Sequence, residues 1–188
     1  MIATLARESR AVVVVAVASA CGILAIPLSG ASLAVPLLPR GMPTGWIAAI
    51  TSAVILVVTV RPQWDASVLA LVRTPYANAA RVGLGLACAA LAYAPWMVTA
   101  ETAENIGWTA LLAIGVAASA VAGPHGWIAV VILGIGLEVA NNAGHRELAH
   151  ATIAHAPAVL AVTIAVLGIS LVALLRRMAT PSWYRETD

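Results

Sequence analysis

Four residues that can bind metals or carry protons lie close together in the polar segment 141–156. They are His145, Glu147, His150 and His155. Glu147 and His150 would share one face of a helix, but di-iron bundles need two such pairs and two further carboxylates. His145 and His150 are too far apart in register to share a face. We therefore expect no metal here, with His145, Glu147 and His150 as weak candidates, and favour a short amphipathic element on the outer membrane surface.

Glu138 is the one acidic residue well inside an apolar segment. An ionisable side chain in hydrocarbon is costly and usually faces a partner or a water-filled path. Two interpretations stay open. Glu138 either hydrogen-bonds a neighbouring helix near the outer surface, helped by Asn141 and Asn142, or it lies on a substrate or proton path. These three residues are the predicted intramembrane polar site.

The composition excludes several classes of function. The chain is 62% hydrophobic and 10% charged, which is typical of an integral membrane protein. It has no Lys, so it cannot form a P-loop nucleotide site, in which a Lys reaches the terminal phosphates. The net charge of +2 is too small to indicate nucleic-acid binding. No Ser/His/Asp or Cys/His arrangement suggests nucleophilic catalysis, so we expect neither enzymatic activity nor a cofactor.

Six apolar segments are predicted to cross a membrane as helices, and the first, 11–28, is about long enough to span it. They predict an all-α integral membrane protein with a single transmembrane domain over residues 1–188. The Pro- and Gly-rich segment 29–43 is expected to be an irregular loop, 99–105 a short acidic turn, and 123–126 the turn of an antiparallel hairpin. The predicted spans are 11–28, 44–60, 82–98, 106–122, 127–140 and 157–175.

Three features of these spans predict how they pack. Trp46 begins the second span and is expected to anchor it at the membrane interface. Cys21 and Cys88 lie in apolar runs and are expected to be small packing residues. The third span carries small residues at helical spacing, which favour close contact between helices in lipid. These are Ala79, Gly83, Ala87, Ala90 and Ala94.

The arginines predict the orientation, because positive charge near span ends favours the cytoplasmic side. With a cytoplasmic N-terminus, eight of the ten arginines lie inside and only Arg40 and Arg146 lie outside. We therefore expect a multi-pass protein of the plasma membrane with both termini in the cytoplasm. The inner arginines would be Arg7, Arg10, Arg61, Arg73, Arg81, Arg176, Arg177 and Arg185.

The connector 61–81 is the longest interruption of the apolar sequence. Asp65 can cap a short helix that ends before Pro75, where the next helix begins. The apolar residues of this short helix share one face. Such a cytosolic amphipathic helix either lies on the lipid surface or docks onto a partner. Its apolar residues are Trp64, Val68, Leu71 and Val72.

This order of elements resembles the membrane subunits of ABC exporters of the second type, in a short version. The shared features are six spans, internal termini, an amphipathic cytosolic helix between spans two and three, and a polar segment before span six. The connector, with Arg-Pro, Thr-Pro-Tyr and then Ala-Ala-Arg, is similar to the segment that these permeases lay on their ATPase. The resemblance implies a permease subunit powered by a separate ATPase, as a homodimer or paired with another permease. The docking residues would be Trp64, Val68, Leu71, Val72 and Arg73.

Two other functions stay open. The chain can be a non-transporting structural or assembly subunit of a larger membrane complex, which would use the small-residue contacts but need no cytosolic docking helix. It can also be a small intramembrane enzyme or metal protein built on the outer His/Glu segment.

Overall fold

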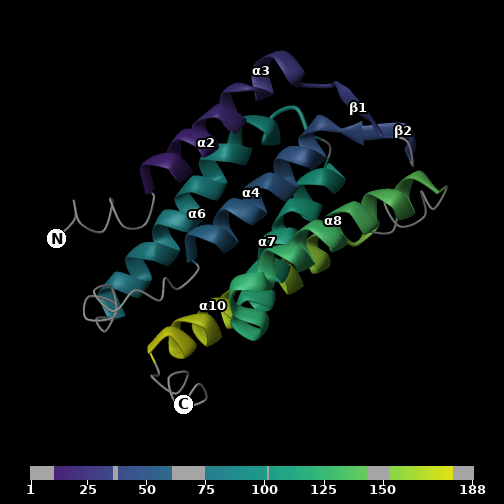
Figure 1. Ribbon diagram of the computed structural model, residues 1–188. Helices are drawn as coiled ribbons and strands as arrows, with labels where there is room; N and C mark the ends of the chain where they lie inside the picture. Colours follow the sequence, from purple (N-terminus) through teal and green to yellow (C-terminus); the bar gives the residue numbers. More distant parts are fainter. Residues whose placement is uncertain (1–10, 36–37, 61–74, 101, 144–152, 180–188) are drawn as a thin grey trace.

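The structure is a computed structural model that describes residues 11–35, 38–60, 75–100, 102–143 and 153–179. Within these ranges the chain is mostly helical, and the long helices lie alongside one another in one bundle (Figure 1). The elements in chain order are α2 (Ala11–Ile23), α3 (Ala25–Leu28), β1 (Ser32–Val35), β2 (Leu38–Pro43), α4 (Thr44–Val60), α6 (Pro75–Met97), α7 (Thr102–Ala122), the 3-10 turn η1 (Gly123–His125), α8 (Gly126–Asn142) and α10 (Ala156–Ala179).

Each predicted apolar segment is helical, but the helices differ in length. Among the described residues, three helices are long and apolar enough to cross a membrane. The other apolar helices are shorter, so the structure supports three candidate spans rather than six. The candidate spans are Ala79–Met97, Thr102–Ala122 and Ala156–Arg176, and the shorter helices are Val13–Leu28, Thr44–Val60 and Gly126–Asn142.

The prediction of an irregular loop at 29–43 is wrong, although the chain is mostly helical as expected. β1 and β2 form an antiparallel hairpin in which Leu33 lies opposite Met42. Gly41 has φ 71°, and a Cβ there would lie 2.7 Å from the carbonyl oxygen of Leu33. Only glycine combines that backbone conformation with so close an approach of the two strands. The hairpin leads directly into α4 at Thr44.

α4 is the central helix of the bundle and packs against α2, α6, α7 and α8. Small residues let its neighbours approach closely, while Leu56 and Val60 fill the space between helices. Lipid tails are as apolar as these side chains, so packing and interhelical hydrogen bonds, rather than burial from water, hold such helices together. The buried residues are Gly45, Trp46, Ala48, Ala49, Ser52, Ala53, Ile55, Leu56, Val57, Thr59 and Val60.

The predicted small-residue stripe of α6 is exposed in this chain. Instead, α6 buries the face that carries Val82, Ala89 and Tyr93. Gly85 lies on this face, where a Cβ would come within 3.0 Å of Leu56 Cδ1 on α4. α6 begins at Pro75, as the connector predicted, and so extends beyond the span 82–98. The exposed stripe consists of Ala79, Gly83, Ala87, Ala90 and Ala94.

α7 and α8 form the expected antiparallel hairpin around η1. Gly123 ends α7 with φ 59°, the left-handed conformation that commonly terminates helices. At the start of α8, Gly126 lies directly against Ser119, and a Cβ there would be 2.7 Å from the Ser119 backbone nitrogen. The hairpin is therefore closed by backbone contact between its two helices.

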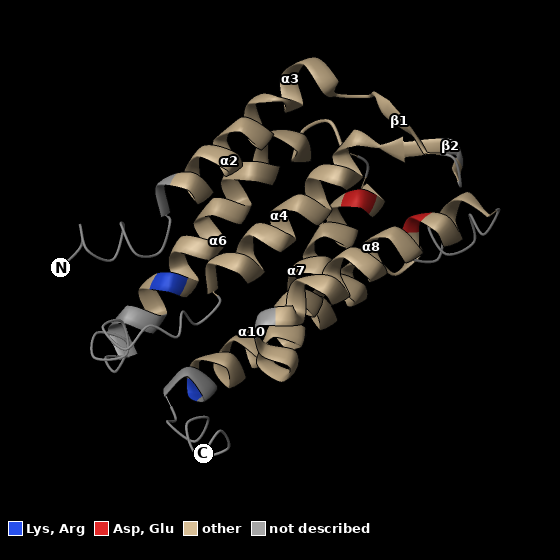
Figure 2. Cartoon of the chain, in the orientation of Figure 1, with Lys and Arg blue, Asp and Glu red and all other residues tan. Residues whose placement is uncertain are grey.

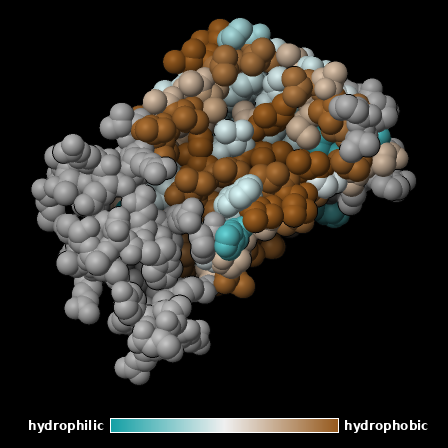
Figure 3. Space-filling view, in the orientation of Figure 1, coloured by the Kyte–Doolittle hydropathy of each residue, from teal (hydrophilic) through white to brown (hydrophobic). Residues whose placement is uncertain are grey.

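The outside of the bundle is apolar. On the face shown in Figure 3, the coloured side chains are mostly hydrophobic. Among the described side chains of α10, only Ser170 and Leu174 are buried. Its exposed side chains include Val162 and Ile169, which are 62% and 70% exposed. A surface this apolar would not stay dispersed in water, which agrees with a membrane environment.

Candidate functional site

The described charges lie at opposite ends of the bundle. Figure 2 shows the acidic positions of α7 and α8 in red near the β-hairpin, and the basic positions of α6 and α10 in blue at the other end. The acidic residues are Glu104 and Glu138, and the basic ones are Arg81 and Arg176. Glu138 is buried and Glu104 lines a depression at the hairpin end, so this end is the candidate functional site.

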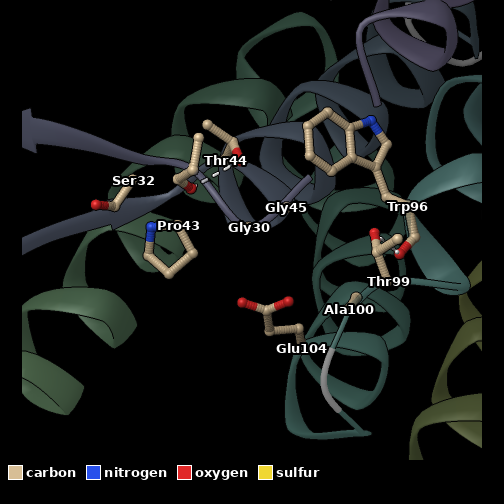
Figure 4. A pocket seen from close by; sticks show the side chains of 10 residues that line it. Gly30, Ser32, Pro43, Thr44, Gly45, Trp96, Thr99, Ala100 and Glu104 are labelled. Atoms are coloured by element: carbon tan, nitrogen blue, oxygen red, sulfur yellow. Dashed lines mark hydrogen bonds between the residues drawn. The ribbon is translucent and has the colours of Figure 1, made fainter. Parts of the chain in front are cut away.

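Glu104 lines an open depression between the hairpin and the starts of α4 and α7. The depression has a volume of about 250 Å³. Figure 4 shows the carboxyl group of Glu104 pointing into it, with Pro43 and Trp96 among the other lining residues. A Cβ on Gly45 would lie 3.1 Å from Glu104 Oε2, so the carboxyl group sits against the first turn of α4. The positive end of a helix dipole stabilises a negative charge there.

The position of Glu104 shows that the prediction for the segment 99–105 was wrong. The segment 99–105 was expected to be an acidic turn, but α7 begins at Thr102 and includes Glu104 in its first turn. Thr44 fixes the opposite wall of the depression, because its Oγ1 lies 2.7 Å from the Leu28 carbonyl oxygen and 2.9 Å from that of Ala31. The first turns of α4 and α7 therefore form the two walls of the depression.

Tyr93 and Trp108 lie beneath the depression, where α6 meets α7. Their rings stack with centroids 4.7 Å apart. The Tyr93 hydroxyl donates to Asn105 Oδ1 at 3.2 Å, and Asn105 Nδ2 donates to the Met97 carbonyl oxygen at 3.3 Å. Stacking and hydrogen bonding therefore fix the start of α7 against the end of α6.

Ser52 connects three helices at the centre of the bundle. Its Oγ donates to the Ala89 carbonyl oxygen on α6 at 2.8 Å and accepts a hydrogen bond from Trp108 Nε1 on α7 at 3.0 Å. Ser52 is fully buried. A buried hydroxyl that both donates and accepts leaves no polar group unpaired at this junction.

We expect Ser52→Ala to lower the free energy of unfolding by about 1–2 kcal/mol, because it leaves the buried Trp108 N–H without an acceptor. Unfolding of the purified protein in mixed micelles, followed by circular dichroism, measures this change. Ser29→Ala is the matched control, since Ser29 is exposed and its Oγ donates only to the carbonyl oxygen of Ile26, three residues earlier. Equal losses in both variants would contradict the role of Ser52.

Trp46 is not the interface anchor that the sequence predicted. It is 6% exposed and lies inside the bundle, where its Nε1 donates to the Gly134 carbonyl oxygen on α8 at 2.9 Å. Gly107 on α7 contacts the indole ring so closely that a Cβ there would overlap it. Trp46 therefore joins α4, α7 and α8 just inside the candidate site.

Glu138 completes the site on α8 and is 6% exposed. Its Oε1 accepts a hydrogen bond from Asn142 Nδ2 at 2.7 Å, one turn further along the same helix. Asn141 is exposed, and its side chain also hydrogen-bonds the carboxyl group. The predicted polar residues of this span therefore lie together, and the charge of Glu104 acts on Glu138 from α7.

Other predicted site residues lie outside the described part of the chain. They are the docking residues Trp64, Val68, Leu71, Val72 and Arg73, and the metal candidates His145, Glu147 and His150. His155 is described and exposed. Within the described ranges, no group of three His, Cys, Asp or Glu side chains could hold a metal ion. Cys21 and Cys88 are free thiols that pack in one apolar cluster with Ala18 and Ile55, as predicted.

Sequence reasoning missed Glu104, Asn105 and Trp108 as parts of one site. The available signal was their spacing, since Glu104 and Trp108 are one helical turn apart and Asn105 lies beside them. This signal was lost because 99–105 was interpreted as a turn.

No family model, curated protein or solved structure matches the chain.

Proposed function

We propose that this chain is the membrane-spanning permease subunit of an export complex that a separate ATPase chain drives. The supporting observation is the position of the connector 61–74 between α4 and α6. α4 ends at Val60, α6 begins at Pro75, and the two helices pack extensively against each other in the core. A force applied to the connector would therefore reach both core helices at once.

Contacts between α4 and α6 provide a path from the connector to the candidate site. Near the connector, a Cβ on Gly85 would lie 3.1 Å from Val60 Cγ2 and 3.0 Å from Leu56 Cδ1. Further along, Ser52 hydrogen-bonds the Ala89 carbonyl oxygen. Close packing makes the two helices move as one unit, so displacement at the connector would change the surroundings of Tyr93 and Trp108.

In the proposed orientation the chain lies in the plasma membrane, with the connector and both termini on the cytoplasmic side. The described arginines Arg81 and Arg176 lie at the connector end, whereas Glu104 and Glu138 lie at the hairpin end. This distribution agrees with the preference of positive charge for the cytoplasmic side. The hairpin and the depression would then face the outside.

We further propose that the three shorter apolar helices also cross the membrane, giving six spans. The shorter helices α2, α4 and α8 pack alongside the longer ones, and α4 is surrounded by α2, α6, α7 and α8. A helix enclosed by protein does not need to match the full thickness of the lipid around it. The ends of all six helices would still lie near the two membrane surfaces.

The proposed docking surface is the apolar face of the connector, with Trp64 as its anchor. A buried aromatic residue of this kind typically contributes about 2 kcal/mol or more to an interface. The chain has no Lys for a P-loop, so ATP would be hydrolysed by the partner. The transport path would be formed by a homodimer or by pairing with a second permease.

A second candidate function is supported by the exposed small-residue stripe of α6. Gly83 lies in this stripe with nothing within 4 Å of a Cβ position. In lipid, such a surface allows a helix of another membrane protein to approach closely. On this evidence the chain would be a non-transporting structural or assembly subunit of a larger complex.

Affinity purification of the tagged chain from its native membrane tests the two candidates. We expect a P-loop ATPase to co-purify with the wild type, and Trp64→Ala and Leu71→Asp to retain at least about tenfold less of it. Ala66→Asp is the matched control, because Ala66 would lie on the opposite face of the connector helix.

An ATPase retained equally by all four proteins would contradict the docking proposal. A membrane partner that survives Leu71→Asp but is lost in Gly83→Leu would favour the structural subunit instead. Circular dichroism of each purified variant confirms that the chain is still folded.

A further inference from the structure

Glu138 and Asn142 form an incomplete hydrogen-bonded pair in the last two turns of α8. The Asn142 amide donates from Nδ2 to Glu138 Oε1 at 2.7 Å. The other end of the same amide, Asn142 Oδ1, is buried and accepts no hydrogen bond. A buried polar atom without a partner is costly and rare in folded proteins. Asn142 Oδ1 therefore lacks a hydrogen-bond donor.

We propose that Glu138 carries a proton in the folded protein and that Glu138 and Asn142 together form a proton-binding site. A neutral carboxylic acid has one acceptor oxygen and one O–H donor, whereas a carboxylate only accepts. The protonated carboxyl group would accept from Nδ2 and donate to Oδ1, which satisfies both ends of the amide. Turning the amide over would bring Oδ1 against Oε1 and also against the Glu138 carbonyl oxygen, which accepts from Nδ2 at 3.2 Å, so the described orientation of the amide is favoured.

The burial of Glu138 favours the neutral form. The residue is 6% exposed in an apolar bundle, and an isolated carboxylate in such surroundings loses most of its solvation. The hydrogen bonds from Asn141 and Asn142 help to stabilise a carboxylate, but neither residue carries the positive charge that would neutralise it. A bound proton removes the charge without a salt bridge.

Among the described residues of the elements packed against α8, one charged side chain acts on this site. These elements are α4, α7, β2 and η1. α4 contains no ionisable residue, and α7 contributes the carboxyl group of Glu104, whose negative charge acts on Glu138. β2 carries Arg40, whose side chain lies outside the described residues, and His125 of η1 is exposed at the opposite end of α8. Two carboxyl groups that repel each other do not both ionise readily, so Glu104 also favours protonation of Glu138.

Infrared spectroscopy of the purified full chain in detergent at neutral pH tests this proposal. A protonated carboxyl group has a C=O stretching band separate from that of carboxylates. We expect this band in the wild type and in Glu104→Gln, and its loss in Glu138→Gln. Glu138→Gln should remain folded, because its amide offers the same donor and acceptor to Asn142.

Asn142→Leu provides a second readout that does not depend on replacing Glu138. We expect the acid band to persist at a shifted frequency, because the C=O group no longer accepts from Nδ2. Identical spectra of the wild type and Glu138→Gln in the acid region would overturn the proposal. So would loss of the band when sodium replaces choline as the cation, since the pair would then bind a metal cation in place of a proton.

Discussion

Replacing Trp46 with Ala is expected to lower the free energy of unfolding by about 3–5 kcal/mol, the range observed when large aromatic residues are removed from cores. Trp46 is 6% exposed and fills the space between α4, α7 and α8. Its removal would leave a cavity against Gly107 and would free the Gly134 carbonyl oxygen from its 2.9 Å hydrogen bond. Both effects act in the same direction.

Unfolding in mixed micelles measures this loss, and two further variants separate its causes. Trp46→Phe keeps most of the ring but removes the N–H donor, so we expect a loss of about 1 kcal/mol. Trp127→Ala is the matched control, because Trp127 is 40% exposed on the surface of α8. Equal destabilisation by Trp46→Ala and Trp127→Ala would show that Trp46 is not a core residue.

Replacing Gly126 with Ala is expected to destabilise the protein by about 1–3 kcal/mol or more, as overpacking does in cores. A Cβ at Gly126 would lie 2.7 Å from the backbone nitrogen of Ser119 and 2.9 Å from its Cα. Backbone atoms inside a helix cannot rotate away, so α7 and α8 would have to separate. The φ of Gly126 is −55°, which suits any residue, and the cost therefore comes from the clash alone.

Gly136→Ala on the same helix is the control for Gly126→Ala. Nothing lies within 4 Å of a Cβ at Gly136, and Ala is a better helix former than Gly by about 1 kcal/mol. We therefore expect Gly136→Ala to be neutral or stabilising in the same unfolding assay. A stabilising effect of Gly126→Ala would contradict the close contact at the start of the α7–α8 hairpin.

The positions of the helices were predictable because hydropathy depends on long runs of residues. The segment 44–60 was predicted to its last residue, and the turn at 123–126 was recognised from Gly-Pro-His-Gly. Such signals are local in sequence. The β-hairpin at 29–43 was missed because its Pro and Gly residues are typical of loops, and strand pairing depends on contacts that composition does not reveal.

The faces of the helices were less predictable than their positions. In water, apolar residues mark the inner face of a helix, but in lipid both faces are apolar. The sequence therefore gave no means to decide that Gly85 of α6 packs against α4 while Gly83 is exposed. Trp46 was misplaced for a related reason, since a Trp near a span end suits the interface as well as a core hydrogen bond.

The unequal lengths of α8 and α10 have a consequence for the surrounding bilayer. α8 has 17 residues and, at about 1.5 Å per residue, is roughly 25 Å long. α10 has 24 residues and by the same rise is roughly 36 Å long. Both helices expose apolar side chains, including Ile132 on α8 and Ile169 on α10. The apolar part of α10 that could cross a membrane is Ala156–Arg176, which is roughly 31 Å long and close to the thickness of about 30 Å of a typical hydrocarbon core. In the proposed six-span arrangement, lipids beside α8 would have to compress, whereas those beside α10 would not. In that arrangement the protein would thin its membrane on the side of α8 only.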